Sequence, residues 1–564
     1  MISDFFPGIP PGIVLILGAL LLPFVGERLR PVFILGLPLI TLALVWRLTD
    51  GASVVVSLLQ YELVLVRSDS LSRLFATIFS IMAFGGGLFA LKQEKILELV
   101  AAFVYAGCAV SVALAGDLIS LFVYWEIMAV ASTLVVLSVG AANSNRTSMR
   151  YFLVHMFGGA LLMTGIVIHI VDTGSTAFTA MQPTSIGTML ILFGFLINAA
   201  APPLSAWLAD AYPEASYSGT VFLSAFTTKA AVYVLIRGFP GAEILIYVGC
   251  FMIFYGIIYA LLENDMRRIL AYSIVNQVGF MVTAVGIGTE MALNGAAAHA
   301  FTHIIYKALL LMSAGAVLYQ TGKRKCTDLG GLFQSMPLTM ICGVVGALSI
   351  SSFPLTSGFI SKSMISQAAS DENMFIVWML LMAASAGVFL HAGIKFPWFV
   401  FFQKDSGLRP KDPPWNMRLA MILFSGLCIG LGIWPEPLYA ILPFTVNYLP
   451  YTVPHVVNML QLLLFSGLAF FLMLPMMKRT LTISLDVDWL YRKLLPVTAR
   501  EFVRIFSPLD RFLRDMVKGW IKVIIQAVQR QNSSEGLLAQ TEHAGHMAQW
   551  MVVLLAVYLV LNFL

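Results

Sequence analysis

The sequence predicts an all-α, polytopic membrane protein with about 16 membrane-spanning helices. Of its 564 residues, 59% are hydrophobic and 11% are charged, whereas soluble domains carry about 25% charged residues. The hydrophobic residues are gathered in stretches of roughly 20, the length that crosses a bilayer as a helix. Charged and histidine side chains nevertheless interrupt several of these stretches, and such residues are typical of ion pathways.

Sixteen stretches are predicted as spans. They cover residues 10–26, 31–48, 72–92, 97–115, 117–139, 150–171, 185–207, 218–238, 242–262, 268–288, 292–319, 336–370, 374–403, 415–433, 455–475 and 549–564. The twelfth is too long for one straight helix and contains SSFPLTSG (351–358), which predicts a broken helix. The seventh ends in AAAPPLSAWLADA (199–211), which predicts a second break.

The two predicted breaks share a pattern. Both contain Pro-Leu followed by small residues and then a charged group, and a lysine follows each one span later, Lys229 and Lys395. Broken helices at matching positions of two halves are typical of transporters built from inverted repeats. We therefore predict two inverted five-helix repeats, each a half-channel.

The chain then divides into six parts. These are the N-terminal spans (1–95), the first repeat (97–238), the second repeat (242–403), the C-terminal spans (415–475), an amphipathic lateral helix region (480–547) and a terminal span (549–564). The region 480–547 is charged and has apolar residues at helical spacing, so we expect it to lie along the membrane surface or a partner. Pro496 and Pro508 are expected to break it. An ordinary interfacial linker is the alternative.

The charge of the loops predicts the orientation. Basic residues follow the odd-numbered spans, so this side is cytoplasmic by the positive-inside rule and both termini lie outside. The loop at 208–217 is an exception, because it is acidic on the basic side. The net charge of +5 is small for this length and predicts no nucleic-acid partner. The five cysteines have no metal-ligand spacing, so we predict no metal site and no cofactor.

Ionisable residues inside the predicted spans are the candidate site, because each costs about 2.5–3.5 kcal/mol at the middle of a membrane helix. The candidates are Glu126 in the fifth span, Lys229 in the eighth, His299, His303 and Lys307 in the eleventh, Lys362 after the break in the twelfth, and Lys395 in the thirteenth. His391 lies near Lys395. His155 and His169 are in the sixth span, where His155 is expected at the interface and His169 in packed core.

The segment HAFTHIIYK (299–307) has two histidines and a lysine four residues apart. Four residues turn a helix by about 400°, so the three side chains lie on one face over a rise of ~12 Å. Neighbouring groups at this spacing can exchange protons directly or through water. A static polar network and a metal site at the two histidines are the alternatives, and Lys395 has the alternative of snorkelling to the interface.

Several motifs resemble the antiporter-like membrane subunits shared by Mrp-type multi-subunit cation/proton antiporters, especially their D subunit, and by respiratory complex I. The resemblance covers roughly residues 70–400. It rests on DLISLFVYWEIM, PPLSAWLADAYPEAS, LSAFTTKAAVYVLIR, NDMRRILAYSIVNQVGF, HAFTHIIYKALLLMSAGAV and FPLTSGFISKSMI. The tail at 480–564 is similar in plan to the complex I subunit with a long lateral helix.

The resemblance implies a proton-translocating subunit whose essential groups match Glu126, Lys229, His299, His303, Lys307 and Lys362. It implies other membrane subunits as partners, protons and Na⁺ or K⁺ as transported ions, and the inner membrane of a bacterial cell. The chain itself is then a transporter subunit and not an enzyme. Alternatives are a proton-supplying subunit of a complex with another task, such as inorganic-carbon uptake or membrane-bound redox chemistry, and a non-conducting scaffold.

One position departs from the family pattern. The family usually has a second lysine five residues before the proline of its PLxxWL motif, and counting back from Pro203 gives Asn198. Asparagine cannot carry a proton in this way. The resemblance therefore leaves Glu126 without its usual cation, for which Lys229 or a bound ion are the possible replacements.

Overall fold

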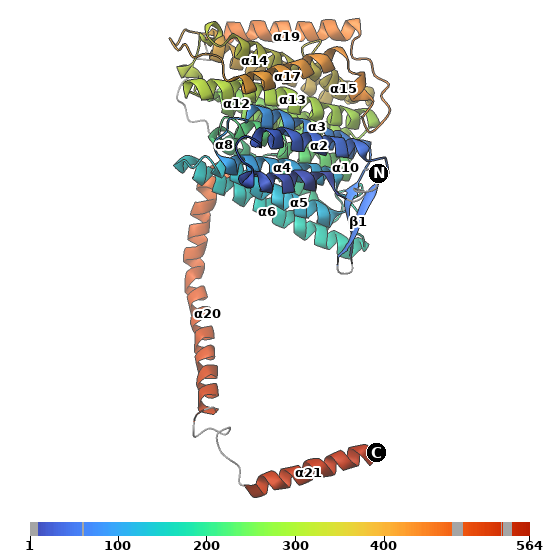
Figure 1. Cartoon of the computed structure of the whole chain (residues 1–564), viewed down its shortest axis with the longest axis vertical. Coiled ribbons are helices and arrows are strands. Elements are labelled where there is room, and N and C mark those ends of the chain that lie inside the picture. The colour runs from blue at the N-terminus through green and yellow to red at the C-terminus, as the bar shows by residue number, and fades with distance from the viewer. Residues whose placement is uncertain (1–8, 59–60, 476–488, 532, 534–543, 564) are drawn as a thin grey trace. The chain divides into compact units, whose positions relative to one another are not determined.

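The computed structural model describes residues 9–58, 61–475, 489–531, 533 and 544–563 (Figure 1). The chain divides into two compact units, Met1–Val487 and Asp488–Leu564, which are described separately. Among the described residues, 13 helices are long and apolar enough to cross a membrane, and shorter apolar helices lie at Pro11–Phe24, Ile186–Asn198 and Pro337–Ile350. Each predicted span overlaps one of these helices, and the all-α, multi-pass fold is confirmed.

The first half of the larger unit consists of helices that follow one another with short connections. They are α1 (Pro11–Leu21), α2 (Arg30–Arg47), α3 (Ser70–Phe89), α4 (Ile96–Leu114), α5 (Leu118–Leu137), α6 (Ala142–Thr173), α7 (Ile186–Asn198), α8 (Ala206–Glu214), α9 (Gly219–Leu223) and α10 (Thr227–Gly238). Figure 1 shows their axes running in similar directions, side by side.

The second half likewise consists of consecutive helices. Its helices are α11 (Ile244–Leu262), α12 (Met266–Ile287), α13 (Glu290–Thr321), α14 (Pro337–Ile350), α15 (Ser357–Asp371), α16 (Phe375–Val388), α17 (Trp415–Ile433), α18 (Glu436–Tyr439) and α19 (Val453–Met473). The helix that begins with α16 continues as two π-helical stretches, η4 (Phe389–Lys395) and η5 (Trp398–Phe402). Helix α13 packs against α3, α12, α14, α15 and α17, and nearly all its residues are buried, so α13 lies at the centre of the unit.

A β-hairpin lies between the second and third predicted spans, where no strand is predicted. Strand β1 (Ser53–Leu58) pairs antiparallel with β2 (Tyr61–Arg67). The backbone N–H of Val64 donates to Oδ2 of Asp117 at 2.7 Å, and Asp117 also caps the first turn of α5. The hairpin therefore holds the start of the helix that carries Glu126.

Both predicted helix breaks are present, and their backbones turn in the same way. After α7, Ala200 has a φ of 61° and the N–H of Ala201 donates to Leu196 O at 3.0 Å. After α14, Ser352 has a φ of 60° and the N–H of Phe353 donates to Leu348 O at 3.0 Å. These are turns that close a helix end by satisfying its last carbonyls. Because each turn sits between two buried helix segments, it exposes further backbone groups to the interior of the protein.

The smaller unit corrects one prediction. Helix α20 (Leu495–Gln531) continues through Pro508, and Pro496 lies in its first turn. A proline in the first turn is tolerated because its missing N–H would have no partner there, and an interior proline removes one bond from a helix that keeps the others. At 1.5 Å per residue α20 is ~55 Å long, which is shorter than the whole region 480–547. Helix α21 (Ala544–Phe563) covers the terminal span up to residue 563, and residue 564 lies outside the described residues.

Candidate functional site

Lys229 lies beside a helix interruption that the sequence does not predict. The eighth span is two helices, α9 and α10, and the residues between them leave backbone carbonyls unpaired. The Lys229 ammonium donates to one of these, Ser224 O, at 2.6 Å and to Thr228 Oγ1 at 3.1 Å. The side chain is fully buried, so it faces the protein interior and not lipid.

The three groups on α13 have different surroundings. His299 interacts through Nδ1 with Ser361 Oγ at 3.0 Å and through Nε2 with Gln277 Oε1 at 3.1 Å. The rings of His299 and His303 are 6.1 Å apart between centroids. Both ring nitrogens of His303 and the amine of Lys307 lack a hydrogen-bond partner among the described residues, although both side chains are fully buried. The predicted alignment on one helix face is therefore accompanied by two polar groups without protein partners.

Lys362 occupies the start of α15, after the second helix break. Its ammonium donates to Ile350 O, the last carbonyl of α14, at 2.7 Å. It also lies 5.0 Å above the centroid of the Phe280 ring, which is a favourable position for a cation. Lys229 and Lys362 thus share one arrangement, since each donates to a carbonyl that an interrupted helix leaves free.

Lys395 is buried, and its ammonium lies among protein groups at the end of α11. Its ammonium donates to the carbonyls that end α11, at 3.0 Å for Ala260, 2.5 Å for Leu261 and 2.7 Å for Glu263. The backbone that carries it is π-helical, a form that is frequent at functional sites. His391, one turn earlier, interacts through Nδ1 with Gly387 O at 2.9 Å.

These groups from four helices form one electrostatic cluster. The charges of Lys229, Lys307 and Lys362 all interact with His303, and Lys307 interacts with the two other lysines. His391 interacts with Lys307, Lys362 and Lys395, which links the thirteenth predicted span to the cluster. A change of charge on one member therefore alters the energy of charging the next.

Glu126 is separate from this cluster. Its side chain is half-buried, and Oε1 has no hydrogen-bond partner in the part of the chain that the structure describes. The carboxyl group lies directly against Gly159 of α6, where a Cβ atom would collide with it. The expectation that Lys229 replaces the missing cation has no support, because Lys229 donates to groups around its own helix interruption.

His155 is buried within the protein. Its helix α6 begins at Ala142, eight residues before the predicted span. Its Nδ1 interacts with Oδ1 of Asn198 at 2.9 Å, and its Nε2 has no partner among the described residues. Asn198 is thus engaged with a histidine and not with Glu126. His169, by contrast, is partly exposed and not packed in the core.

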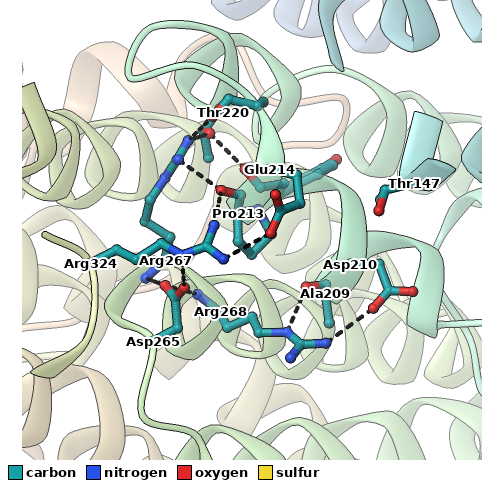
Figure 2. A network of polar contacts seen from close by, with 12 residues as sticks. Thr147, Ala209, Asp210, Pro213, Glu214, Thr220, Asp265, Arg267, Arg268 and Arg324 are labelled. Carbon is teal, nitrogen blue, oxygen red and sulfur yellow. Dashed lines mark hydrogen bonds and ion pairs between the residues drawn. The ribbon is translucent and has the colours of Figure 1, made fainter. Parts of the chain in front are cut away.

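A polar network joins the loops on the predicted basic side (Figure 2). The buried Arg267 guanidinium donates to Pro213 O and Ala215 O at 2.9 Å each, to Ser216 O at 2.7 Å, and to the Thr220 hydroxyl. A guanidinium has five N–H donors in a planar fork and a lysine ammonium has three, so an arginine can serve these four acceptors at once.

The acidic loop that breaks the charge pattern is neutralised by its neighbours in this network. Arg324 pairs with Glu214 and with Asp265, both at 2.9 Å, and Arg268 pairs with Asp210 at 3.0 Å. Burial raises the pKa of Asp265, an effect that Arg324 opposes. Because the basic partners come from the loops after the ninth and eleventh predicted spans, the acidic loop lies at the same end of the helices as those basic loops.

Metal-ligating side chains do not cluster in the region that the structure covers. No set of three or more His, Cys, Asp or Glu side chains lies close enough to hold a metal ion there. The pair His299 and His303 consequently has no third side chain of these types to complete a coordination shell.

Comparison with known proteins gives one consistent picture. Residues 115–388 match the family described as NADH:quinone oxidoreductase/Mrp antiporter, TM. The D component of the Na(+)/H(+) antiporter of Alkalihalophilus pseudofirmus is 29% identical over 347 residues, 58% of this chain and 70% of that protein. Hydrogenase-4 component B of Escherichia coli is 24% identical over 423 residues, 66% of this chain and 63% of that protein.

The fold of this chain also resembles that of a chain in a solved structure. A chain in the structure of the Mrp complex from Dietzia sp. superposes with a TM-score of 0.67 at 21% identity, over 76% of this chain and 94% of that one. The family match at residues 115–388 contains every predicted transport residue except Lys395.

Proposed function

We propose that this chain is the proton-translocating subunit of a multi-subunit cation/proton antiporter or a related complex in a bacterial inner membrane. Protons would pass along Glu126, Lys229, His299, His303, Lys307, Lys362 and Lys395. The observation that carries the proposal is the unpartnered state of His303 and Lys307 among the described residues, between Lys229 and Lys362 on neighbouring helices. The relation to antiporter subunits named above supports the same role.

Buried polar groups without partners are unusual, because each destabilises the folded protein by about 1–3 kcal/mol when it is neither hydrated nor hydrogen-bonded. A static network would satisfy its members. A group that must gain and lose a proton is better without a fixed hydrogen-bond partner, since a partner that stabilises one protonation state slows the change to the other. Lys307 and His303 fit this second case.

Transfer along the cluster follows from its electrostatics. A proton that arrives on Lys229 disfavours a positive charge on Lys307, and one on Lys307 disfavours a charge on Lys362. Loading the first lysine thus promotes release from the next. The carbonyls at Ser224 and Ile350 stabilise the charged form at the two outer lysines, while Lys307 between them has no such acceptor among the described residues.

The two half-channels at residues 97–238 and 242–403 are part of this proposal. The matching turns after α7 and α14 support a repeat, because each has a left-handed residue and the same backbone hydrogen bond across it. Protons, and Na⁺ or K⁺ on the antiport route, are the proposed transported ions. Other membrane subunits are the proposed partners.

The test is proton flux through the complete complex, purified by a tag on this chain and reconstituted in vesicles with an imposed cation gradient. Lys362→Ala should abolish cation-dependent flux. Lys323→Ala is the matched control, because Lys323 is an exposed lysine in a loop and should leave flux unchanged. Flux of the Lys362 variant equal to that of the wild type would contradict the proposal.

A second candidate is the proton-supplying membrane subunit of a redox complex. The relation to a hydrogenase-4 component favours it, and nothing in the fold distinguishes the two uses. The proteins that co-purify with this chain decide between them. Subunits that carry flavin or iron–sulfur clusters would support the redox complex, and further antiporter subunits would support the first candidate.

A further inference from the structure

The first half-channel contains a second pair of buried polar atoms without partners, apart from the cluster around Lys307. Oε1 of Glu126 and Nε2 of His155 have no hydrogen-bond partner in the described residues. Both belong to the neighbourhood of α6. His155 is on this helix, and the Glu126 carboxyl contacts it at Gly159, one turn later. We propose that His155 relays the proton between Glu126 and Lys229, and that Asn198 holds its ring in the required tautomer.

The tautomer follows from the Asn198 contact. The amide oxygen of Asn198 can only accept a hydrogen bond, so Nδ1 of His155, 2.9 Å away, carries the hydrogen. The lone pair of the neutral ring is then on Nε2, the nitrogen that is buried without a partner among the described residues. Asn198 cannot take the Nδ1 proton, so Nε2 is the only nitrogen of His155 that accepts and releases one.

The helix surface around His155 is open toward Glu126. Two successive glycines, Gly158 and Gly159, follow one turn after the histidine. A Cβ atom at Gly159 would overlap the Glu126 carboxyl, and one at Gly158 would make an ordinary contact at 3.7 Å with Oδ1 of Asn198. The absence of a side chain at Gly159 therefore lets the carboxyl reach the turn of α6 that follows His155, while Gly158 faces the Asn198 amide.

Hydroxyl groups lie near His155 on the side of Lys229. The ring of Tyr151 contacts that of His155, with 4.2 Å between centroids. The Tyr151 hydroxyl donates to Ser132 Oγ at 2.9 Å and also lies near Thr227. Thr227 is the first residue of α10, two positions before Lys229, and it shares a 2.6 Å hydrogen bond with the hydroxyl of Tyr105. Polar contacts thus lead from the imidazole to the helix interruption that holds Lys229, and the Glu126 carboxyl lies against the same helix one turn after the imidazole.

The proposed step conserves atoms and charge. The O–H bond of protonated Glu126 breaks and an N–H bond forms at Nε2 of His155, through intervening water, which gives a carboxylate and an imidazolium. The Nδ1–H of the imidazolium remains bonded to Asn198. The N–H bond at Nε2 then breaks, and the proton passes along the hydroxyl groups to the neutral amine of Lys229. The inference rests on the proposed function, because it requires proton flux through this subunit.

The experiment uses the complete complex in vesicles. His155→Gln should lower proton flux by about tenfold or more, the scale of a lost proton-transfer group, while the complex stays intact by size-exclusion chromatography. Asn198→Lys places an amine beside position 155, so the double variant His155→Gln with Asn198→Lys should recover flux. A purely structural role for His155 predicts no such recovery.

Two outcomes overturn the inference. One is wild-type flux in the His155→Gln variant, and the other is an intact double variant that stays inactive. If Lys362→Ala abolishes flux while His155→Gln does not, this inference fails and the proposed function stands. If Lys362→Ala has no effect, the proposed function itself fails.

A variant that keeps the histidine tests the positioning role of Asn198 and covers the case in which His155→Gln does not assemble. Asn198→Leu removes the acceptor of the Nδ1–H, so the pH at which flux is half-maximal should move downward. Among the described residues, Tyr151 on its own helix and the uncharged Trp207 of α8 contact the His155 ring, and Glu126 of α5 lies against Gly159, one turn further along α6. An unchanged pH profile would overturn the role of Asn198 and, with it, the relay.

Discussion

Replacing Lys307 with methionine should make the protein more stable while it removes a transport group. Lys307 is fully buried at the centre of the unit, and its amine has no hydrogen-bond partner among the described residues. A buried polar group without a partner destabilises the folded state by about 1–3 kcal/mol. Methionine keeps a chain of similar length and the contacts of the methylene groups.

We expect Lys307→Met to raise the free energy of unfolding by about 1–2 kcal/mol. This is less than the full penalty of an unpartnered amine, because water that reaches the amine relieves part of that penalty. For a unit of this size such a gain raises the Tm by roughly 2 °C. Buried thiols such as those of Cys108 and Cys428 become reactive on unfolding, so a thiol-reactive fluorophore reports the transition.

Lys362→Met is the matched control. This lysine donates to Ile350 O at 2.7 Å, so the same substitution leaves a buried carbonyl without its partner and should lower the Tm. If Lys307→Met instead lowers the Tm by several degrees, Lys307 holds helices together through polar contacts, and the interpretation of it as an unpartnered proton carrier is refuted.

Two further predictions concern groups outside the helix interiors. Burial raises the pKa of Asp69, but Arg237 at 2.7 Å and the N–H of Ser72 outweigh it and hold the pKa below its usual 3.8. Because the pKa of Asp69 is lowered in the folded state, Asp69→Asn should lower the free energy of unfolding by about 1 kcal/mol above pH 5. Below pH 3.8 the wild-type carboxylate also becomes protonated, so the difference between the two proteins should disappear as the pH falls further. The measurement is the Tm of both proteins as a function of pH. Arg267→Lys should lower the free energy of unfolding by about 2–3 kcal/mol, because a lysine cannot reach the four acceptors at 213–220, and limited proteolysis of that segment should become faster. Unchanged stability in either variant contradicts the assigned pairing.

The helix breaks are predictable because proline restricts its own backbone geometry. Pro203 and Pro354 lie inside apolar stretches, where an interior proline removes a helical hydrogen bond, and both helices end before them. The interruption between α9 and α10 has no proline and no glycine, so periodicity alone cannot reveal it. Only the packing of Lys229 against Ser224 shows why the helix opens there.

The helix that carries His155 starts earlier than the sequence indicates. Polar residues at 142–149 are typical of a loop, which would place His155 near a membrane surface. In the structure α6 already begins at Ala142, and Ser144 and Ser148 are buried within it. The contact with Asn198 joins residues 43 positions apart, which no local pattern encodes.

The β-hairpin does leave a signal in the sequence. SVVVSL and YELVLVR are rich in β-branched residues and are shorter than a span, both of which are typical of strands. Pro508 shows the opposite case, in which a strong local signal does not decide the structure. A helix of 37 residues retains enough hydrogen bonds to continue through a single proline.

Proton flux through vesicles that contain the intact complex with Lys307→Met tests the central claim most directly. We expect flux at the level of protein-free vesicles in a variant that is at least as heat-stable as the wild type, since the proton pathway loses one titratable group and the fold loses no hydrogen bond. Wild-type flux in that variant would contradict the claim that protons cross through the buried groups of this chain.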